Sequence, residues 1–133
     1  MRGVFLDTSA ILGLLNPADR VHETAKRIFF RLAADEVPLF TTSYVLVETF
    51  ALLGRRFGLD AARSFQHKFV PLLRVVWVDE TLHALAVEEW LRRSVRQLSL
   101  VDVVSFLVIR EEDLPAAFAF DRHFEEEGFT LLS

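Results

Sequence analysis

Short runs of bulky apolar residues alternate along the chain with longer segments of mixed polarity. The first run, residues 4–6, is continuous and bounded by polar residues, as in a strand buried on both faces. Similar runs follow at residues 38–42, 75–78 and 118–120, and a last one spans residues 129–131. We predict that each of these runs forms a β-strand.

The longer segments between these runs have apolar residues at helical spacing, three or four positions apart. Residues 100–109 are rich in valine and strand-like by propensity, but they continue without a break into Arg110. A parallel sheet also needs a crossover before the next strand, so we assign this segment to a helix. The predicted helices cover residues 10–15, 19–34, 44–57, 60–73, 82–96 and 100–112, with Asp19, Ser43, Asp60 and Ser99 as predicted N-terminal caps.

Strands that alternate with helices throughout predict an α/β fold. We expect a three-layer sandwich, with a mainly parallel twisted sheet flanked by helices. Neither an internal repeat nor a linker is recognisable, so a single domain over residues 1–133 is expected. In sheets of this kind, ligands bind at the carboxyl ends of the strands.

The amino-acid composition limits the cellular environment of the protein and the kinds of metal and ligand sites it can form. The 133 residues are 52% hydrophobic with 13 Phe, enough for a sizeable core, and the absence of Cys excludes disulfides and thiolate metal sites. The apolar runs are too short for a membrane span, and Asp7 interrupts the amino-terminal one, so a cytoplasmic protein without membrane contact is expected. A net charge of −4 disfavours nucleic-acid binding, unless cations neutralise several acids at one site.

Two acids directly follow predicted strands. Asp7 comes after residues 4–6, and Asp121 comes after residues 118–120. An acid at this position can cap the helix that follows, or it can hold a cation. Each acid taken alone is compatible with both roles.

Two further acids lie within predicted helices. The helix of Glu48 is apolar nearly all the way round and has no basic residue three or four positions away, so we expect Glu48 to be buried. A buried unpaired carboxylate must be protonated, paired at long range or bound to metal. Asp102 has a local explanation, because Ser99 and Asp102 match a capping box.

The topology allows these four acids to meet. Asp7 and Asp121 end parallel strands, and Asp102 begins the helix that leads to one of them. Glu48 lies early in the helix that follows another strand. Four acids in one crevice repel strongly unless cations neutralise them, and ligands that are all oxygen suit Mg2+ or Mn2+.

Four segments of the chain, in this order, resemble the PIN domain family, and most closely the VapC-type toxins of bacterial toxin–antitoxin pairs. The segments are residues 5–10, 42–48, 98–102 and 119–124, followed by Gly128 and Phe129. Phe120 is a departure, since many members carry Thr or Ser there. The resemblance covers essentially the whole chain.

The resemblance implies a Mg2+-dependent endoribonuclease, with Mn2+ as a substitute. Its acids would correspond to Asp7, Glu48, Asp102 and Asp121, holding one ion or two ions about 4 Å apart. Ser9, and with it Thr8, matches the polar position after the first acid, which can orient a water. The implied partners are an RNA substrate and an antitoxin protein. The surplus of apolar residues, together with the resemblance, also predicts a homodimer, and we expect its contact among the helices between residues 19 and 73.

Other readings remain open at this point. A receiver domain would use Asp79 as its phosphorylated acid, but it also needs a Lys after the last strands, and the only lysines are Lys26 and Lys68. A haloacid-dehalogenase-like phosphatase needs an Asp where Ser9 stands. A PIN fold that binds RNA or protein without cutting is a further alternative. No histidine has a partner at metal-binding spacing, so we expect packing or solvent-exposed roles for His22, His67, His83 and His123.

Overall fold

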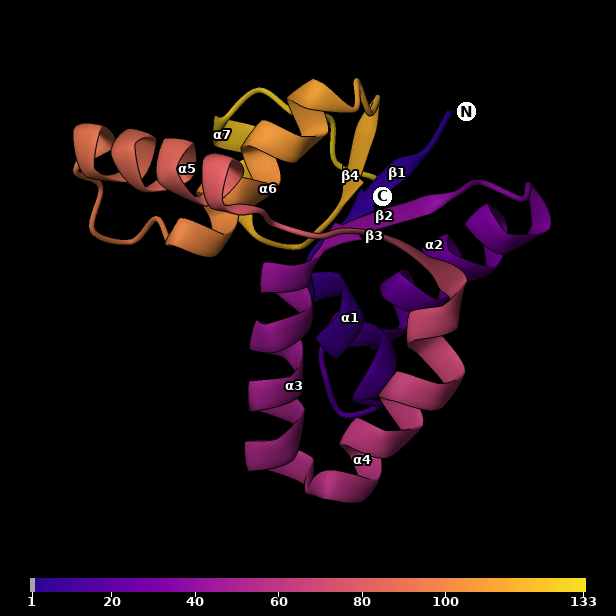
Figure 1. Ribbon diagram of the computed structural model, residues 1–133. Coiled ribbons are helices and arrows are strands. Elements are labelled where there is room, and N and C mark those ends of the chain that lie inside the picture. The colour runs from indigo at the N-terminus through magenta and orange to yellow at the C-terminus, as the bar shows by residue number, and fades with distance from the viewer. Residues whose placement is uncertain (1) are drawn as a thin grey trace.

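The computed structural model describes residues 2–133 as a parallel four-stranded sheet between two groups of helices (Figure 1). The strand order is β3-β2-β1-β4, and every pair is parallel, which confirms the predicted α/β sandwich. The strands are β1 (Val4–Leu6), β2 (Leu39–Thr42), β3 (Leu73–Val76) and β4 (Ala116–Phe118). The helices are α1 (Thr8–Leu15), α2 (His22–Ala34), α3 (Ser43–Phe57), α4 (Leu59–Ser64), α5 (Glu80–Arg93), α6 (Leu100–Glu111) and α7 (Arg122–Glu126), with a π-helical turn η1 (Phe65–Phe69) and a 3-10 turn η2 (Val70–Leu72) between α4 and β3.

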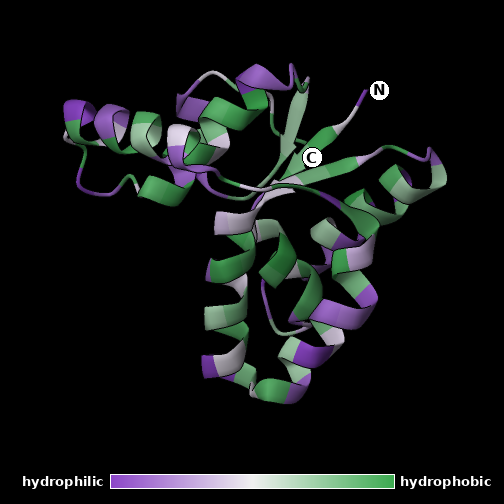
Figure 2. Ribbon diagram, viewed as in Figure 1, coloured by the Kyte–Doolittle hydropathy of each residue, from purple (hydrophilic) through white to green (hydrophobic). Residues whose placement is uncertain are grey.

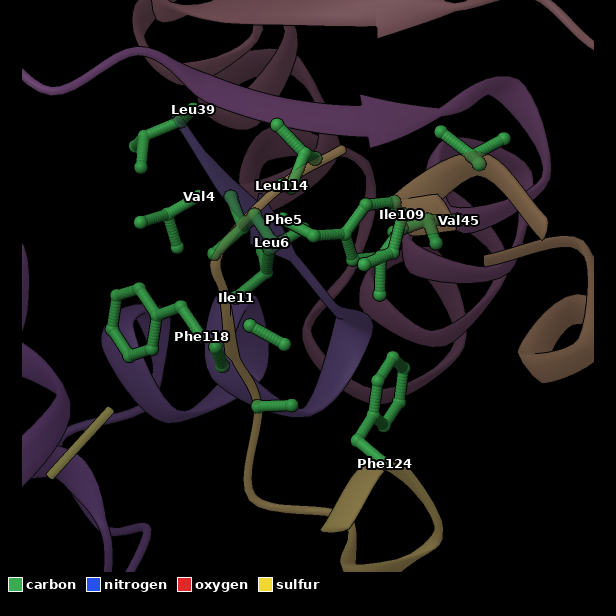
Figure 3. Close-up of a cluster of buried hydrophobic side chains, with 14 of the residues drawn as sticks. Val4, Phe5, Leu6, Ile11, Leu39, Val45, Ile109, Leu114, Phe118 and Phe124 are labelled. Carbon is green, nitrogen blue, oxygen red and sulfur yellow. The ribbon is translucent and has the colours of Figure 1, made fainter. Parts of the chain in front are cut away.

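Strand β1 lies at the centre of the core. Its three residues are fully buried, because β2 and β4 pair with its two edges and helices cover both faces. Figure 3 shows Phe5 and Leu6 among side chains from β4, α1 and α6. Figure 2 shows the same hydrophobic centre, with polar residues concentrated on the outer turns of the helices.

The helices lie on opposite sides of the sheet. Figure 1 shows α1, α2, α3 and α4 on one side and α5, α6 and α7 on the other. Since the strands are parallel, α1, α3 and α7 all begin at the edge where β1, β2 and β4 end. No helix among residues 2–133 is long and apolar enough to cross a membrane.

Local signals explain where several helices begin. The side chain of Asp79 caps α5, and Ser99 and Asp102 form the predicted capping box at the start of α6. The prediction of Ser43 as the cap of α3 is wrong by one residue, because the Thr42 side chain accepts the backbone N–H of Val45. Asp60 does not cap α4. The residue at the N-cap is Gly58, whose φ of 90° favours glycine.

Two predicted strands are displaced along the chain, and a third is absent. β3 and β4 both begin two residues earlier than predicted, since pairing with the neighbouring strand sets their limits, whereas the apolar runs continue beyond it. Trp77 lies past the end of β3 and is 73% exposed. Residues 129–131 form no strand, and only Leu131 makes an isolated parallel bridge, to Ala117.

Candidate metal centre

Asp7 lies at the junction of β1 and α1 and is buried. Its Oδ2 accepts hydrogen bonds from the Ser9 backbone N–H at 3.1 Å and from the Ser9 hydroxyl at 2.6 Å, so Asp7 caps α1. The same Ser9 Oγ accepts the backbone N–H of Phe120 at 2.9 Å. Ser9 therefore holds Asp7 against the chain that leaves β4.

Burial and neighbouring charge make the ionised form of Asp7 unfavourable. Loss of hydration raises the pKa of Asp7 to about 6, and the negative charges of Asp102 and Asp121 act in the same direction. The Ser9 hydrogen bonds oppose this shift without cancelling it. The carboxyl group of Asp7 is thus placed where a cation would stabilise its charged form.

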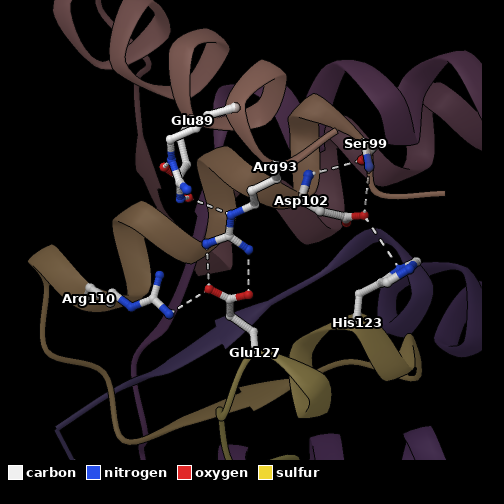
Figure 4. Close-up of polar contacts among 8 residues, drawn as sticks. Glu89, Arg93, Ser99, Asp102, Arg110, His123 and Glu127 are labelled. Carbon is white, nitrogen blue, oxygen red and sulfur yellow. Dashed lines mark hydrogen bonds and ion pairs between the residues drawn. The ribbon is translucent and has the colours of Figure 1, made fainter. Parts of the chain in front are cut away.

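Asp102, Asp121 and His123 form the centre of the site. One ligand atom from each lies within 4.8 Å of those of the other two. The Nδ1 of His123 is 2.9 Å from Asp121 Oδ1. It is also 3.9 Å from Asp102 Oδ2, a contact that Figure 4 shows. Burial, and then the charge of Asp121, raises the pKa of Asp102. The prediction of a packing or solvent-exposed role for His123 did not foresee this contact.

Backbone hydrogen bonds fix the two acids at the starts of helices. Asp102 accepts the Ser99 N–H at 3.3 Å, while its own N–H donates to Ser99 Oγ at 3.0 Å. Asp121 caps α7 by accepting the N–H of His123 at 2.9 Å. Asp102 is therefore both a capping residue and a member of the acid cluster.

The structure does not bring Glu48 into contact with the other acids. Glu48 is half-buried rather than buried, and among the described residues it makes no hydrogen bond or ion pair. Its helix does pack beside α1, where the Thr49 hydroxyl lies 3.4 Å from the Thr8 hydroxyl. Thr8 thus links α1 to α3 next to Asp7, and Glu48 immediately precedes Thr49 in α3.

An ion-pair network supports the helix that carries Asp121 and His123. Arg93 on α5 donates to both carboxylate oxygens of Glu127, at 2.6 and 2.7 Å, and Arg110 on α6 donates to the same group at 2.7 Å (Figure 4). The hydrogen bond from Arg93 lowers the pKa of Glu127. Glu127 follows directly after α7, so the network fixes α7 against α5 and α6.

The donor set fits a divalent cation. Asp102 and Asp121 supply carboxylate oxygens and His123 an imidazole nitrogen, all within one group. Asp7 lies outside this group but close enough for its charge to interact with both acids. Within residues 2–133, neither Lys nor Arg forms an ion pair with any of these three acids. No Lys or Arg therefore compensates their mutual repulsion, and His123 is the one basic side chain beside them among the described residues. Asp79, the acid required by a receiver domain, instead caps α5 through the N–H of Leu82.

The parallel sheet and the acids at its carboxyl edge define a class of protein. The profile of the PIN domain family matches residues 4–129, so the chain belongs to the PIN domain family. It is 37% identical over 127 residues to the 23S rRNA-specific endonuclease VapC20 of Mycobacterium tuberculosis, covering 95% of each chain. The crystal structure of that VapC20, described as a sarcin–ricin loop cleaving toxin, aligns with a TM-score of 0.82 over 96% of this chain and 97% of the other.

More distant structures share the fold. FitAcB from Neisseria gonorrhoeae aligns with a TM-score of 0.71 at 14% identity, over 98% of this chain and 96% of the other. The structure of VapBC2 from Rickettsia felis, bound to a DNA fragment from the VapBC2 promoter, aligns with a TM-score of 0.67 at 12% identity. The alignment covers 97% of this chain and 96% of the other. At such identities, these likenesses support the fold alone.

Proposed function

We propose that the protein is a Mg2+-dependent endoribonuclease that hydrolyses phosphodiester bonds of ribosomal RNA, with Mn2+ as an alternative ion. The observation that carries this proposal is the group of three carboxylates at the carboxyl edge of the sheet, unpaired with Lys or Arg among the described residues. The substrate class follows from a relative that is 37% identical over nearly its whole length and is named for 23S rRNA.

The proposed ion is held by Asp7, Asp102 and Asp121, with Glu48 at the side of α3 available for a second ion. When bound, such an ion neutralises the acids, polarises a phosphodiester group and makes water more acidic. Without it, the acid cluster would repel the phosphate backbone of RNA.

The chain's own residues orient this chemistry. Ser9 occupies Asp7 Oδ2 with two hydrogen bonds, which leaves Oδ1 for a cation or for the proton of an attacking water. Since Ser9 Oγ also binds the Phe120 N–H, it keeps Asp7 and Asp121 in register across two adjacent strands. Thr8 fixes the start of α1 against α3 through Thr49 and so assists in placing Asp7.

The test of this function is cleavage of a hairpin RNA with the sequence of the 23S sarcin–ricin loop. We expect site-specific cutting with Mg2+ or Mn2+, none in EDTA, and recovery when excess Mg2+ is added. An Asp60→Asn variant is the matched control, because the Asp60 side chain is 98% exposed and far from the acids. Unchanged cleavage in verified excess chelator would overturn the metal mechanism, and metal binding without cleavage would favour a PIN module that only binds.

We also propose two protein partners, an antitoxin and a second copy of the chain. For the homodimer, we expect light scattering at micromolar concentration to return about twice the chain mass of 15.3 kDa. The segment proposed for this contact exposes apolar side chains at Phe30, Phe57 and Leu59.

A charge introduced on that segment should weaken the dimer. Leu59→Lys is the informative variant, since Leu59 is 66% exposed, and Leu85→Lys on α5 is its control at 56% exposure. A wild-type mass near 15.3 kDa would argue against the dimer, and dissociation by Leu85→Lys alone would move the contact to α5.

A further inference from the structure

His123 has a feature that its ion-pairing neighbours do not explain. Its Nδ1 is buried and makes no aligned hydrogen bond within the described chain, although it lies 2.9 Å from Asp121 Oδ1. That oxygen already accepts the backbone N–H of His123 at 2.9 Å. The imidazole nitrogen is therefore close to two carboxylates without the geometry of a donor to either.

Two electron-rich atoms this close need a positive species between them. In a neutral imidazole, the nitrogen without a hydrogen carries a lone pair, which repels carboxylate oxygens. A proton on Nδ1 would also relieve this repulsion, but the ring is not aligned to donate it in a hydrogen bond to either carboxylate. A metal ion relieves it differently, because each ligand atom points at the ion and not at the other ligands.

The distances agree with shared coordination. Bonds of about 2.0–2.2 Å to nitrogen and oxygen place the ligands of one ion up to about 4.4 Å apart. The ligand atoms of Asp102, Asp121 and His123 lie within 4.8 Å of one another, so small side-chain movements suffice. The ion pairs of Glu127 with Arg93 and Arg110 hold the far end of α7 in place. The movements required are those of side chains, and the helix itself can stay where it is.

We infer that Nδ1 of His123 is a direct ligand of the ion held by Asp102 and Asp121, and that it gives this site a preference for transition-metal ions over Mg2+. The inference deepens the proposed function, on which it rests, by naming a nitrogen donor at the same site. Imidazole binds ions such as Co2+ more strongly than it binds Mg2+, which prefers oxygen ligands. The proton of the ring then lies on Nε2.

The test compares the wild type with His123→Asn, because an Asn side chain can place an oxygen near the position of Nδ1. Calorimetric titration of the metal-free protein with Co2+ and with Mg2+ measures both affinities. We expect His123→Asn to weaken Co2+ binding at least about tenfold while changing Mg2+ binding by less than about threefold. His67→Ala, at an exposed position on η1, should leave both affinities unchanged.

A spectroscopic measurement makes the assignment direct. In pulsed EPR of the Mn2+-loaded protein, we expect coupling to an imidazole nitrogen in the wild type and in His67→Ala but not in His123→Asn. Absence of this coupling in the wild type, or an equal loss of Co2+ and Mg2+ affinity in His123→Asn, would overturn the inference and leave His123 as a partner of Asp121. Circular dichroism of each variant verifies the fold.

The RNA assay separates this inference from the proposed function. If the wild type cuts RNA with Mg2+ but shows no nitrogen coupling, the inference fails and the nuclease proposal stands. If nitrogen coupling is present and RNA is left intact with each metal, the nuclease proposal fails and the ligand assignment stands. Failure to bind Co2+, Mn2+ or Mg2+ would overturn both.

Discussion

Asp7→Asn is expected to make the metal-free protein more stable at pH 8 by about 2 kcal/mol. The pKa of Asp7 rises from 3.8 to about 6 in the folded state, which corresponds to roughly 3 kcal/mol at about 1.4 kcal/mol per pKa unit. Asn carries no charge, and its side-chain oxygen can still cap α1. A weaker cap offsets part of the gain, by up to about 1 kcal/mol.

The sign of this effect depends on pH. A carboxyl group with a raised pKa binds its proton more tightly in the folded state, so its stabilising contribution is full below about pH 4 and is lost as the pH rises through about 6. Above that, the folded protein contains a poorly solvated charge. We therefore expect Asp7→Asn to be no more stable than the wild type at pH 4, where only the weaker cap remains, and to reach its full advantage at pH 8.

Thermal melts in EDTA at pH 4, 6 and 8 measure this dependence. An advantage of about 2 kcal/mol corresponds to a melting temperature higher by about 8 °C for a chain of this size. Asp60→Asn removes an exposed charge and should leave the melting temperature nearly unchanged. A variant that melts below the wild type at pH 8 would show that the cap outweighs the buried charge.

Asp102→Asn is expected to reduce RNA cleavage by more than about 100-fold under saturating Mg2+. Loss of a group that merely supports a metal ligand typically costs 10- to 100-fold, so loss of a direct ligand should cost more. The variant removes one charge from the cluster with Asp121 and His123 but keeps an oxygen that can accept the Ser99 N–H. The loss is therefore attributable to the site and not to the start of α6.

Asp102→Ala separates the two roles of this residue. Without metal, Asp102→Asn should melt above the wild type, because like charges are relieved while the capping box is retained. Asp102→Ala removes that box as well, so it should be less stable than Asp102→Asn by about 1 kcal/mol. Millimolar Mg2+ should stabilise the wild type more than either variant. Equal Mg2+ stabilisation of all three proteins would remove Asp102 from the site.

Signals local in sequence predicted the fold well. The continuous apolar run at β1 and the break at Asp7 predicted the junction of β1 and α1. The segment of α6 is rich in valine, which favours a strand, but its length predicted a helix, and the helix is present. The ends of β3 and β4 were missed by two residues, since backbone pairing and not side-chain type sets them.

The site was less accessible to such reasoning. Glu48 was predicted to be buried because α3 is apolar nearly all round, yet Val47 beside it is 68% exposed, so one side of α3 lacks a packing partner. His123 lies two residues after Asp121, a local spacing that was interpreted only as a helix start. Its other neighbour, Asp102, lies on another helix, and no local spacing reports that contact. The proximity of Asp7 to Asp102 and Asp121 follows from parallel topology, which the order of elements did predict.

Asp7, Asp102 and Asp121 each lie at the beginning of a helix, and this position holds them in place even without a cation. Asp7 and Asp121 cap α1 and α7, and Asp102 belongs to the first turn of α6. Backbone N–H groups and the positive ends of these helix dipoles thus hold the acids whether or not a cation is present. The site is preorganised, so removing the cation should silence the proposed enzyme without unfolding it, and reloading should need no refolding.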